Sequence, residues 1–331
     1  MPLSRRDEGP RRPIVVSQGE PSGIGPEIAV KAYAALNGTV DGRAIRLIGG
    51  GDIFREAARF SGIDAKLFSN AVIDTRVNAR VEPGHPSTDN SAGVTAAILR
   101  GVRVCERGEA AALVTAPIHK SVLNAAGFGF PGHTEYLAHL TGTARAVMML
   151  ASRDVEPPLR VAPFTIHMAL SEIFRHLDAD SIAATATIIL DALARDFGIA
   201  NPRLAVAGLN PHAGEDGTMG REDIDILAPA IASLRAKGFN VTGPLSADTL
   251  FHDDARARYD AALCMYHDQA LIPIKTLAFW TGVNVTLGLP IVRTSPDHGT
   301  ALAIAGQGVA DAASMIAAIR TAGEIADRRG L

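Results

Sequence analysis

The chain of 331 residues is predicted to be an α/β protein with mostly parallel or mixed β-sheets. Short apolar runs bounded by turn residues alternate along its length with segments of helical periodicity. Hydrophobic residues make up 47% of the chain and aromatic residues only 5%, which is typical of parallel sheets covered by alanine-rich helices. No linker or short repeat interrupts the alternation, so two domains would have to be joined by strands or short turns.

The first half of the chain begins with an apolar strand at residues 14–17, followed by the loop QGEPSGIG and a helix that starts at Pro26. Glycines before a helix N-terminus are typical of an anion site, but this spacing is neither a dinucleotide-binding fingerprint nor a P-loop. A tight turn feeding a helix explains the loop about as well. Further strands are expected at 43–52 and up to Thr115, with a helix starting after Asp89.

The second half continues the alternation, with expected strands at 146–151, 159–167, 203–208, 261–266, 283–287 and 290–292. A helix at 178–198 is expected to be capped by Asp180 or Ser181 and to stop at Gly198. Another at 221–238 contains Pro229, which is expected to kink it. A final amphipathic helix is expected at 311–330.

Composition excludes several classes of protein. Lysine and arginine number 32 against 35 acidic residues, a net charge of −3, so a nucleic-acid partner is not expected. Residues 1–12 are charged and lead into no apolar segment, which predicts a disordered leader and not a signal peptide. No apolar run reaches membrane-spanning length, and Cys105 and Cys264 are expected to be buried reduced thiols. A cytoplasmic protein without a membrane partner is the expectation.

The stretch 265–300 combines chemically capable side chains with apolar segments, which predicts one wall of an active site. Lys275, Asn284 and Arg293 lie nine residues apart within it. Fixed positive donors and an amide suit a phosphate or carboxylate, and His133 and Thr134 after a glycine can add donors to the same anion. Ordinary surface charge is the alternative.

Three histidines each follow an apolar strand: His167, His212 and His267. Because the carboxyl ends of parallel strands meet at one edge, these imidazoles can gather around a divalent ion, most naturally Zn²⁺. Their spacing is not that of a compact metal motif, and a lone histidine is more often a core or loop residue. The spacing alone therefore leaves both interpretations open.

Several long motifs, in order from about residue 14 to the C-terminus, identify the chain as a member of a known family. They are GEPSGIGPEI, TAPIHK, GFPGHTEYL, LNPHAGEDGTMGREDI, GPLSADTLF, MYHDQ and GVNVTLGLPIVRTSPDHGTALAIAG. Together they resemble the 4-hydroxythreonine-4-phosphate dehydrogenase (PdxA-like) family of vitamin B6 biosynthesis.

The resemblance implies an isocitrate/isopropylmalate-dehydrogenase-like fold of two α/β/α domains with a cleft between them. The first, on the cofactor side, is expected to span 13–131 and 296–331, and the second, with metal, substrate and dimer contacts, 132–295. The enzyme is expected to be a homodimer whose active sites are shared between chains, with His267 reaching in from the partner.

The resemblance also implies roles for residues. His167, His212 and His267 match metal ligands, with zinc most expected and magnesium or cobalt as alternatives. Asp248 and Asp268 are candidates for proton transfer or for orienting a ligand. The substrate-binding matches are His133, Thr134, Lys275, Asn284 and Arg293, and the cofactor candidates are Asp297, His298, Gly299 and Thr300.

The activity implied is an NAD- or NADP-dependent oxidation of the C3 hydroxyl of 4-phosphohydroxy-L-threonine, assisted by the metal. Decarboxylation to 3-amino-2-oxopropyl phosphate follows, in pyridoxal phosphate biosynthesis. Side branches of the family act instead on D-threonate or D-erythronate 4-phosphate, and the sequence does not separate these substrates. A phosphate acyltransferase-like transferase is the alternative from another class.

Overall fold

The computed structural model describes residues 11–76 and 81–331. The chain divides into two compact units, Met1–Ala144 with Leu289–Leu331 (unit 1) and Arg145–Gly288 (unit 2). The boundaries expected from the sequence are 131/132 and 295/296. Residues 1–10 of the expected leader lie outside the described residues, whereas Arg11, next in the chain, donates a hydrogen bond to the Asp41 carbonyl.

The sheet of unit 1 is parallel except for one short strand. Its order is β2 (Thr39–Val40), β3 (Arg43–Gly49), β1 (Ile14–Ser17), β5 (Ala112–Thr115) and β12 (Val292–Pro296), with β4 (Val72–Asp74) paired to β3. Strand β2 runs antiparallel to β3, and the described pairs β1–β3, β1–β5, β5–β12 and β3–β4 are parallel. Because β1, β5 and β12 are covered on both faces, all their residues are buried, and buried and exposed positions do not alternate along them. The register pairs Ser17 with Thr115, so these two strands end at the same edge.

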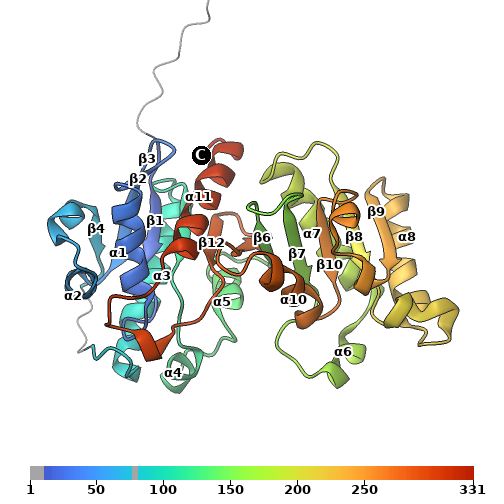
Figure 1. Ribbon diagram of the computed structural model, residues 1–331, viewed down its shortest axis with the longest axis horizontal. Helices are drawn as coiled ribbons and strands as arrows, with labels where there is room; N and C mark the ends of the chain where they lie inside the picture. Colours follow the sequence, from blue (N-terminus) through green and yellow to red (C-terminus); the bar gives the residue numbers. More distant parts are fainter. Residues whose placement is uncertain (1–10, 77–80) are drawn as a thin grey trace, which may run out of the picture. The chain divides into compact units, whose positions relative to one another are not determined.

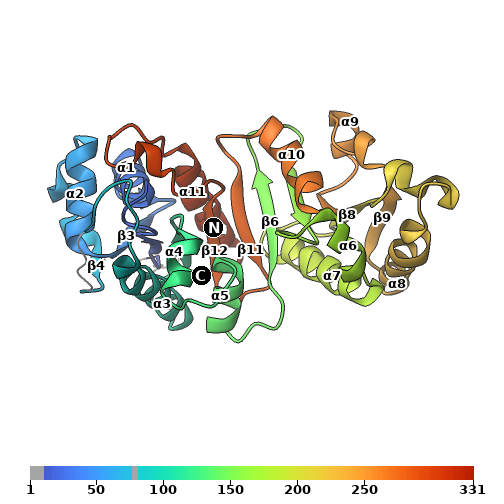
Figure 2. The same cartoon turned by 90° about the horizontal axis from the view of Figure 1, so that it is seen from below.

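In the described part of unit 1 there are six α-helices: α1 (Gly25–Ala35), α2 (Gly51–Ser61), α3 (Ser91–Glu106), α4 (Lys120–Ala125), α5 (His133–Leu140) and α11 (Ala313–Arg328). Within this unit, α1 and α11 cover one face of the sheet and α3 the other (Figures 1 and 2). Helix α3 lies close to β5 because Gly101 has no side chain: a Cβ there would stand 2.6 Å from Leu113 Cδ1. Short 3₁₀ turns occur at Ala65–Leu67, Ser69–Ala71, Thr88–Asn90 and Leu302–Ile304.

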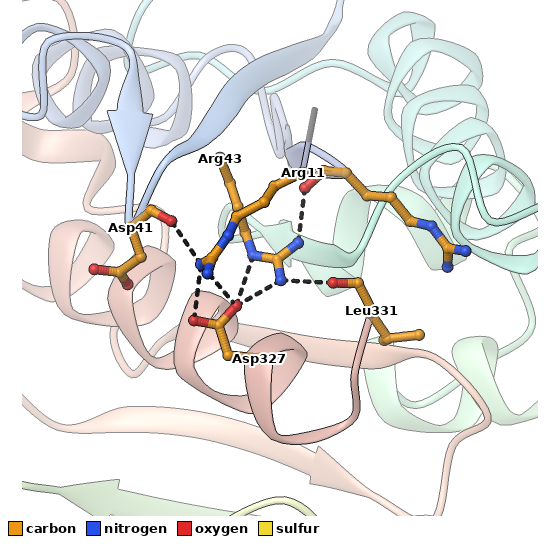
Figure 3. Close-up of polar contacts among 6 residues, drawn as sticks. Arg11, Asp41, Arg43, Asp327 and Leu331 are labelled. Carbon is orange, nitrogen blue, oxygen red and sulfur yellow. Dashed lines mark hydrogen bonds and ion pairs between the residues drawn. The ribbon is translucent and has the colours of Figure 1, made fainter. Parts of the chain in front are cut away.

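A buried arginine ties the last helix of unit 1 to the sheet (Figure 3). Arg43 at the start of β3 is 2% exposed and donates to Asp327 Oδ1 through Nε at 3.1 Å and Nη2 at 2.5 Å. The same guanidinium donates to the main-chain oxygens of Arg12 and Leu331. The Asp327 carboxylate and two main-chain oxygens thus satisfy this buried cation, as its burial requires.

The sheet of unit 2 is mixed, in the order β11 (Val283–Leu287), β6 (Val147–Ser152), β7 (Leu159–Pro163), β10 (Ala261–Cys264), β8 (Arg203–Ala207) and β9 (Asn240–Leu245). Strand β6 is antiparallel to both its neighbours, and the other pairs are parallel. Strands β7, β10 and β8 are consecutive in the sheet, so their carboxyl ends share one edge. This arrangement places the three candidate histidines on neighbouring loops.

Helices α7 (Ala179–Arg195) and α8 (Ala228–Ala236) cover one face of this sheet and α10 (His267–Leu277) the other (Figure 2). Two shorter helices are α6 (Leu170–His176) and α9 (Asp253–Arg256). The expected cap of α7 was wrong: Asp178, not Asp180 or Ser181, accepts from the Ser181 amide at 2.8 Å. Pro229 lies in the first turn of α8, directly after a π-helical turn at Asp223–Leu227, and this irregular turn interrupts the regular α-helix expected over 221–238.

Both cysteines are free, Cys264 fully buried and Cys105 partly so, and burial raises the pKa of the Cys105 thiol to about 12. In the described part of the chain no helix is both long and apolar enough to cross a membrane.

Candidate active site

The first group of candidate residues lies in unit 1, at the carboxyl edge of its sheet. Arg293 on β12 is 2% exposed, and its guanidinium donates to the Thr115 hydroxyl through Nε at 3.2 Å and Nη2 at 2.6 Å. Thr115 ends the adjacent strand β5. Burial lowers the pKa of Arg293 to about 9, and the nearby Glu135 carboxylate opposes this shift. The guanidinium is still protonated at neutral pH, so this edge carries a buried positive charge.

His133 begins α5 beside this arginine, as expected of the loop-to-helix junction. Its Nε2 atom is buried and has no hydrogen-bond partner among the described residues. Burial, and then the charges of Arg293 and Lys120, hold the pKa of His133 well below its ordinary value. The imidazole is therefore neutral at physiological pH, and its enclosed nitrogen is available to a bound group. Thr134 follows on the same helix turn.

The cofactor candidates 297–300 lie in the loop after β12, against the glycine loop that follows β1. The Ile24 amide donates to the Thr300 carbonyl at 2.9 Å. A Cβ on Gly23 would stand 2.7 Å from that carbonyl oxygen, so the approach of the two loops requires glycine there. His298 and Gly299 are exposed at the tip of the segment, and the Asp297 amide contacts Ser314 Oγ at 3.4 Å.

The second group lies in unit 2 around a pocket of about 430 Å³. Its walls are residues 165–170, which follow β7, together with Ile173 and residues 266–268, which follow β10. The Thr165 hydroxyl donates to the Met265 carbonyl at 2.8 Å and so joins the two loops. His167 and His267 face each other here with ring centroids 5.7 Å apart.

The His267 ring is oriented by its neighbour in the sequence. Its Nδ1 lies 2.7 Å from Asp268 Oδ1, an arrangement that leaves Nε2 pointing away from the carboxylate. Gln269 fixes the base of this loop, because its side chain accepts from the Met265 amide at 2.6 Å and donates to the Gly208 carbonyl at 2.8 Å. The loops after β10 and β8 are thereby joined.

His212 lies in the third loop, in the turn Pro211–Gly217, with φ of +50°. Ala213, Glu215 and Asp216 also have positive φ, a conformation that costs L-residues roughly 1 kcal/mol or more each and is concentrated at functional sites. Buried Asp223 holds the start of this loop by accepting from the amides of Leu209 at 2.8 Å and Asn210 at 3.1 Å.

Asp248, in the 3₁₀ turn Ala247–Thr249, faces the same loop. It accepts from the Ser246 hydroxyl at 2.5 Å, and this hydrogen bond, with a smaller contribution from the charge of His212, lowers the pKa of Asp248. The carboxylate is therefore ionised at neutral pH.

The histidine pair fits the donor chemistry of a divalent ion. Two imidazoles that share a tetrahedral ion about 2 Å from each ring nitrogen have centroids roughly 5 Å apart. The observed 5.7 Å is close to that separation. Across residues 11–76 and 81–331, however, no three His, Cys, Asp or Glu side chains converge closely enough to hold a metal. His167 and His267 thus lie close to the separation that two ligands of one ion would have, whereas His212 does not form a three-residue group with them.

The remaining expected substrate residues belong to unit 2. Lys275 lies on α10 with its Nζ 5.4 Å from the centre of the Phe279 ring. Asn284 lies on β11, and its Oδ1 is buried without a hydrogen-bond partner in the described residues. Of the five substrate candidates, His133, Thr134 and Arg293 are thus brought together in unit 1, and Lys275 and Asn284 stand in unit 2.

Sequence analysis missed the residues that hold these groups in place: Thr115, Asp223 and Gln269. Each lies inside a quoted motif or next to one, but each contacts a segment distant in the sequence. Asp223 has only the signature of an acidic residue in a first helical turn, and Thr115 only that of a strand end. No spacing pattern in the sequence distinguishes residues that hold a site in place from other residues at a strand end or in a first helical turn.

The fold is of the isocitrate/isopropylmalate-dehydrogenase-like class. A β-decarboxylating dehydrogenase from Thermococcus kodakarensis shares this fold, with a TM-score of 0.50 over 97% of this chain and 84% of its own at 14% identity. The predicted fold class is confirmed.

The family follows from closer similarities. The sequence model described as "Pyridoxal phosphate biosynthetic protein PdxA" matches residues 41–322. The 4-hydroxythreonine-4-phosphate dehydrogenase of Paracoccus denitrificans is 53% identical over 319 residues, 96% of this chain and 99% of that protein. The crystal structure of the enzyme of that name from Klebsiella pneumoniae matches with a TM-score of 0.82 and 37% identity, covering 95% and 99% of the two chains. The chain belongs to the PdxA family, a family of oxidoreductases, and the resemblance found in its motifs is confirmed.

Proposed function

We propose that this chain is an NAD- or NADP-dependent dehydrogenase that oxidises the C3 hydroxyl of 4-phosphohydroxy-L-threonine. The 3-oxo acid then loses CO₂, gains a proton and leaves as 3-amino-2-oxopropyl phosphate. The relatives named for 4-hydroxythreonine 4-phosphate, at identities of about 50%, support this substrate.

The observation that carries the proposal is the buried cation in unit 1. Arg293 is 2% exposed and lies beside a neutral imidazole, that of His133, whose enclosed Nε2 has no hydrogen-bond partner among the described residues. A phosphate offers acceptor oxygens to both groups, and its negative charge suits the guanidinium. We assign the substrate phosphate to Arg293, His133 and Thr134, and propose Lys275 and Asn284 as further substrate-binding residues.

We propose that His167, His212 and His267 hold one divalent metal ion, zinc in the first instance and magnesium or cobalt as alternatives. The pair His167 and His267, with ring centroids 5.7 Å apart within one chain, supports this assignment, and we propose His212 as the third ligand. When bound, the ion would supply Lewis-acid polarisation of the reacting oxygen. Asp268 keeps the His267 ring in one orientation, and ionised Asp248 is the candidate proton acceptor.

We propose that residues 297–300 and the glycine loop 18–25 contact the nicotinamide cofactor, which accepts the hydride when bound. The close packing of these two loops at the carboxyl edge of the unit 1 sheet supports this placement. We also propose a homodimer that shares its active sites between chains, so a monomeric variant is expected to be inactive.

The test is a turnover assay with purified protein, a divalent metal and either NAD⁺ or NADP⁺. 4-Phosphohydroxy-L-threonine is expected to give NAD(P)H together with CO₂. Faster turnover of D-threonate or D-erythronate 4-phosphate would reassign the substrate, and the absence of NAD(P)H with all three would refute the reaction class.

A further inference from the structure

Two charged side chains beside the Arg293 group belong to neither the metal set nor the expected substrate set. Lys120 is the first residue of α4 and is exposed. Glu135 lies in the first turn of α5 and is partly buried. Both act electrostatically on the buried group: Lys120 adds to the lowering of the His133 pKa that burial and Arg293 cause, and Glu135 opposes the lowering of the Arg293 pKa that burial causes.

Gly132, the residue before α5, places these two side chains close together. A Cβ on Gly132 would stand 3.3 Å from Lys120 Cε and 3.6 Å from Lys120 Nζ. The same point is 3.4 Å from Glu135 Oε2. The ammonium and the carboxylate therefore both lie within van der Waals distance of the position that a Cβ at residue 132 would take.

We propose that Lys120 is an additional substrate-binding residue and that Glu135 is the resident counter-charge of the empty site. This inference rests on the proposed phosphate site of Arg293. Lys120 adds a second positive charge toward a bound dianion, and Glu135 compensates the two cations while no anion is bound. A bound phosphate compensates the two cations in place of Glu135, and the Glu135 carboxylate repels the phosphate.

The charge count gives opposite signs for the two residues. Lys120, Arg293 and Glu135 together carry a net charge of one positive unit, because His133 is neutral. Without Glu135 the net charge rises to two, which matches a phosphate dianion. Without Lys120 it falls to zero. Glu135→Gln is therefore expected to tighten phosphate binding and Lys120→Met to weaken it.

The experiment is calorimetric titration of the intact protein with inorganic phosphate at pH 8, at two salt concentrations. Lys120→Met is expected to weaken binding about three- to tenfold and Glu135→Gln to tighten it by a similar factor, values typical of one partly screened charge. Lys66→Met, an exposed lysine of the same unit, is the matched control and is expected to change nothing.

Turnover separates substrate binding from a purely structural role. Lys120→Met is expected to raise KM with little change in kcat, and Lys120→Arg to restore most of the affinity. Equal phosphate affinity of wild type, Lys120→Met and Glu135→Gln would overturn the inference. If Arg293→Met also binds phosphate as wild type does, the proposed phosphate site itself is wrong; if only Arg293→Met loses binding, that site stands and only the role of Lys120 and Glu135 falls.

Discussion

The Arg293 guanidinium and the Thr115 hydroxyl are joined by two hydrogen bonds, at 2.6 and 3.2 Å, across the neighbouring strands β12 and β5. Both side chains are buried, and the two hydrogen bonds to the hydroxyl orient the guanidinium. Thr115 is therefore expected to affect the affinity for phosphate without contacting the phosphate itself.

Thr115→Val tests this relationship while keeping the size and branching of the side chain. A hydrogen bond to a charged group contributes about 1.5–3 kcal/mol, so the variant is expected to weaken phosphate binding about tenfold or more. Isothermal titration with inorganic phosphate measures the change. Thr115→Ser keeps the hydroxyl and is expected to bind like the wild type, and an equal loss in both variants would point to packing instead of orientation.

The depressed pKa of His133 predicts a pH dependence of stability. The folded chain holds this imidazole neutral, while the unfolded chain binds a proton below about pH 6.5. The contribution to stability is thus fully present above about pH 6.5 and decreases as the pH falls below that value, until the folded-state pKa is reached. Urea unfolding of wild type and His133→Gln between pH 5 and 8 measures it. The wild type is expected to lose stability relative to the variant only on the acidic side, and a pH-independent difference between the two would contradict the prediction.

The three candidate histidines show how much of the site could be predicted from the sequence. Each of the apolar strands β7, β8 and β10 could be read from its own residues, and so could the histidine that follows it. The order β7-β10-β8 could not, because β10 pairs with a strand about a hundred residues earlier through contacts that leave no local pattern. Nor does the sequence indicate that Pro211–Gly217 adopts positive φ, which sets the direction of His212.

The roles of Asp178 and Lys120 also could not be predicted from local sequence patterns. Three polar residues within four positions all suit an N-cap, and only the backbone conformation selects Asp178 for α7. Lys120 meets the start of α5 through a loop of irregular conformation, so neither helical nor strand periodicity predicts the contact.

Removal of one imidazole of the facing pair tests the metal assignment. His267→Ala is expected to abolish tight zinc binding and turnover, and Asp268→Asn to weaken zinc binding about ten- to a hundredfold by releasing the ring. Zinc affinity is measured by competition with a chromophoric chelator, and circular dichroism monitors the fold. His252→Ala, an exposed histidine of the same unit, is the control. Wild-type zinc affinity in His267→Ala would remove the metal from this site.

The last prediction concerns the contact between Arg43 and Asp327 in unit 1 (Figure 3). Arg43 is 2% exposed, whereas the Asp327 side chain is 39% exposed, so the pair is only partly desolvated. Asp327→Ala leaves the buried guanidinium with the main-chain oxygens of Arg12 and Leu331. Loss of one partner of a fully buried pair costs about 3–5 kcal/mol, and the exposure of Asp327 reduces the expected loss to about 1–3 kcal/mol of unfolding free energy.

Arg11 provides the comparison, because it contacts the same carboxylate from an exposed position, 3.2 Å from Oδ2. Arg11→Met is expected to change the unfolding free energy by less than about 1 kcal/mol, since exposed ion pairs contribute little. Guanidinium denaturation of both variants gives the two values. Because guanidinium chloride also screens charges, urea denaturation at low salt is the second measurement, and it is expected to preserve the order. Equal losses in the two variants would show that the burial of Arg43 does not decide the strength of this contact.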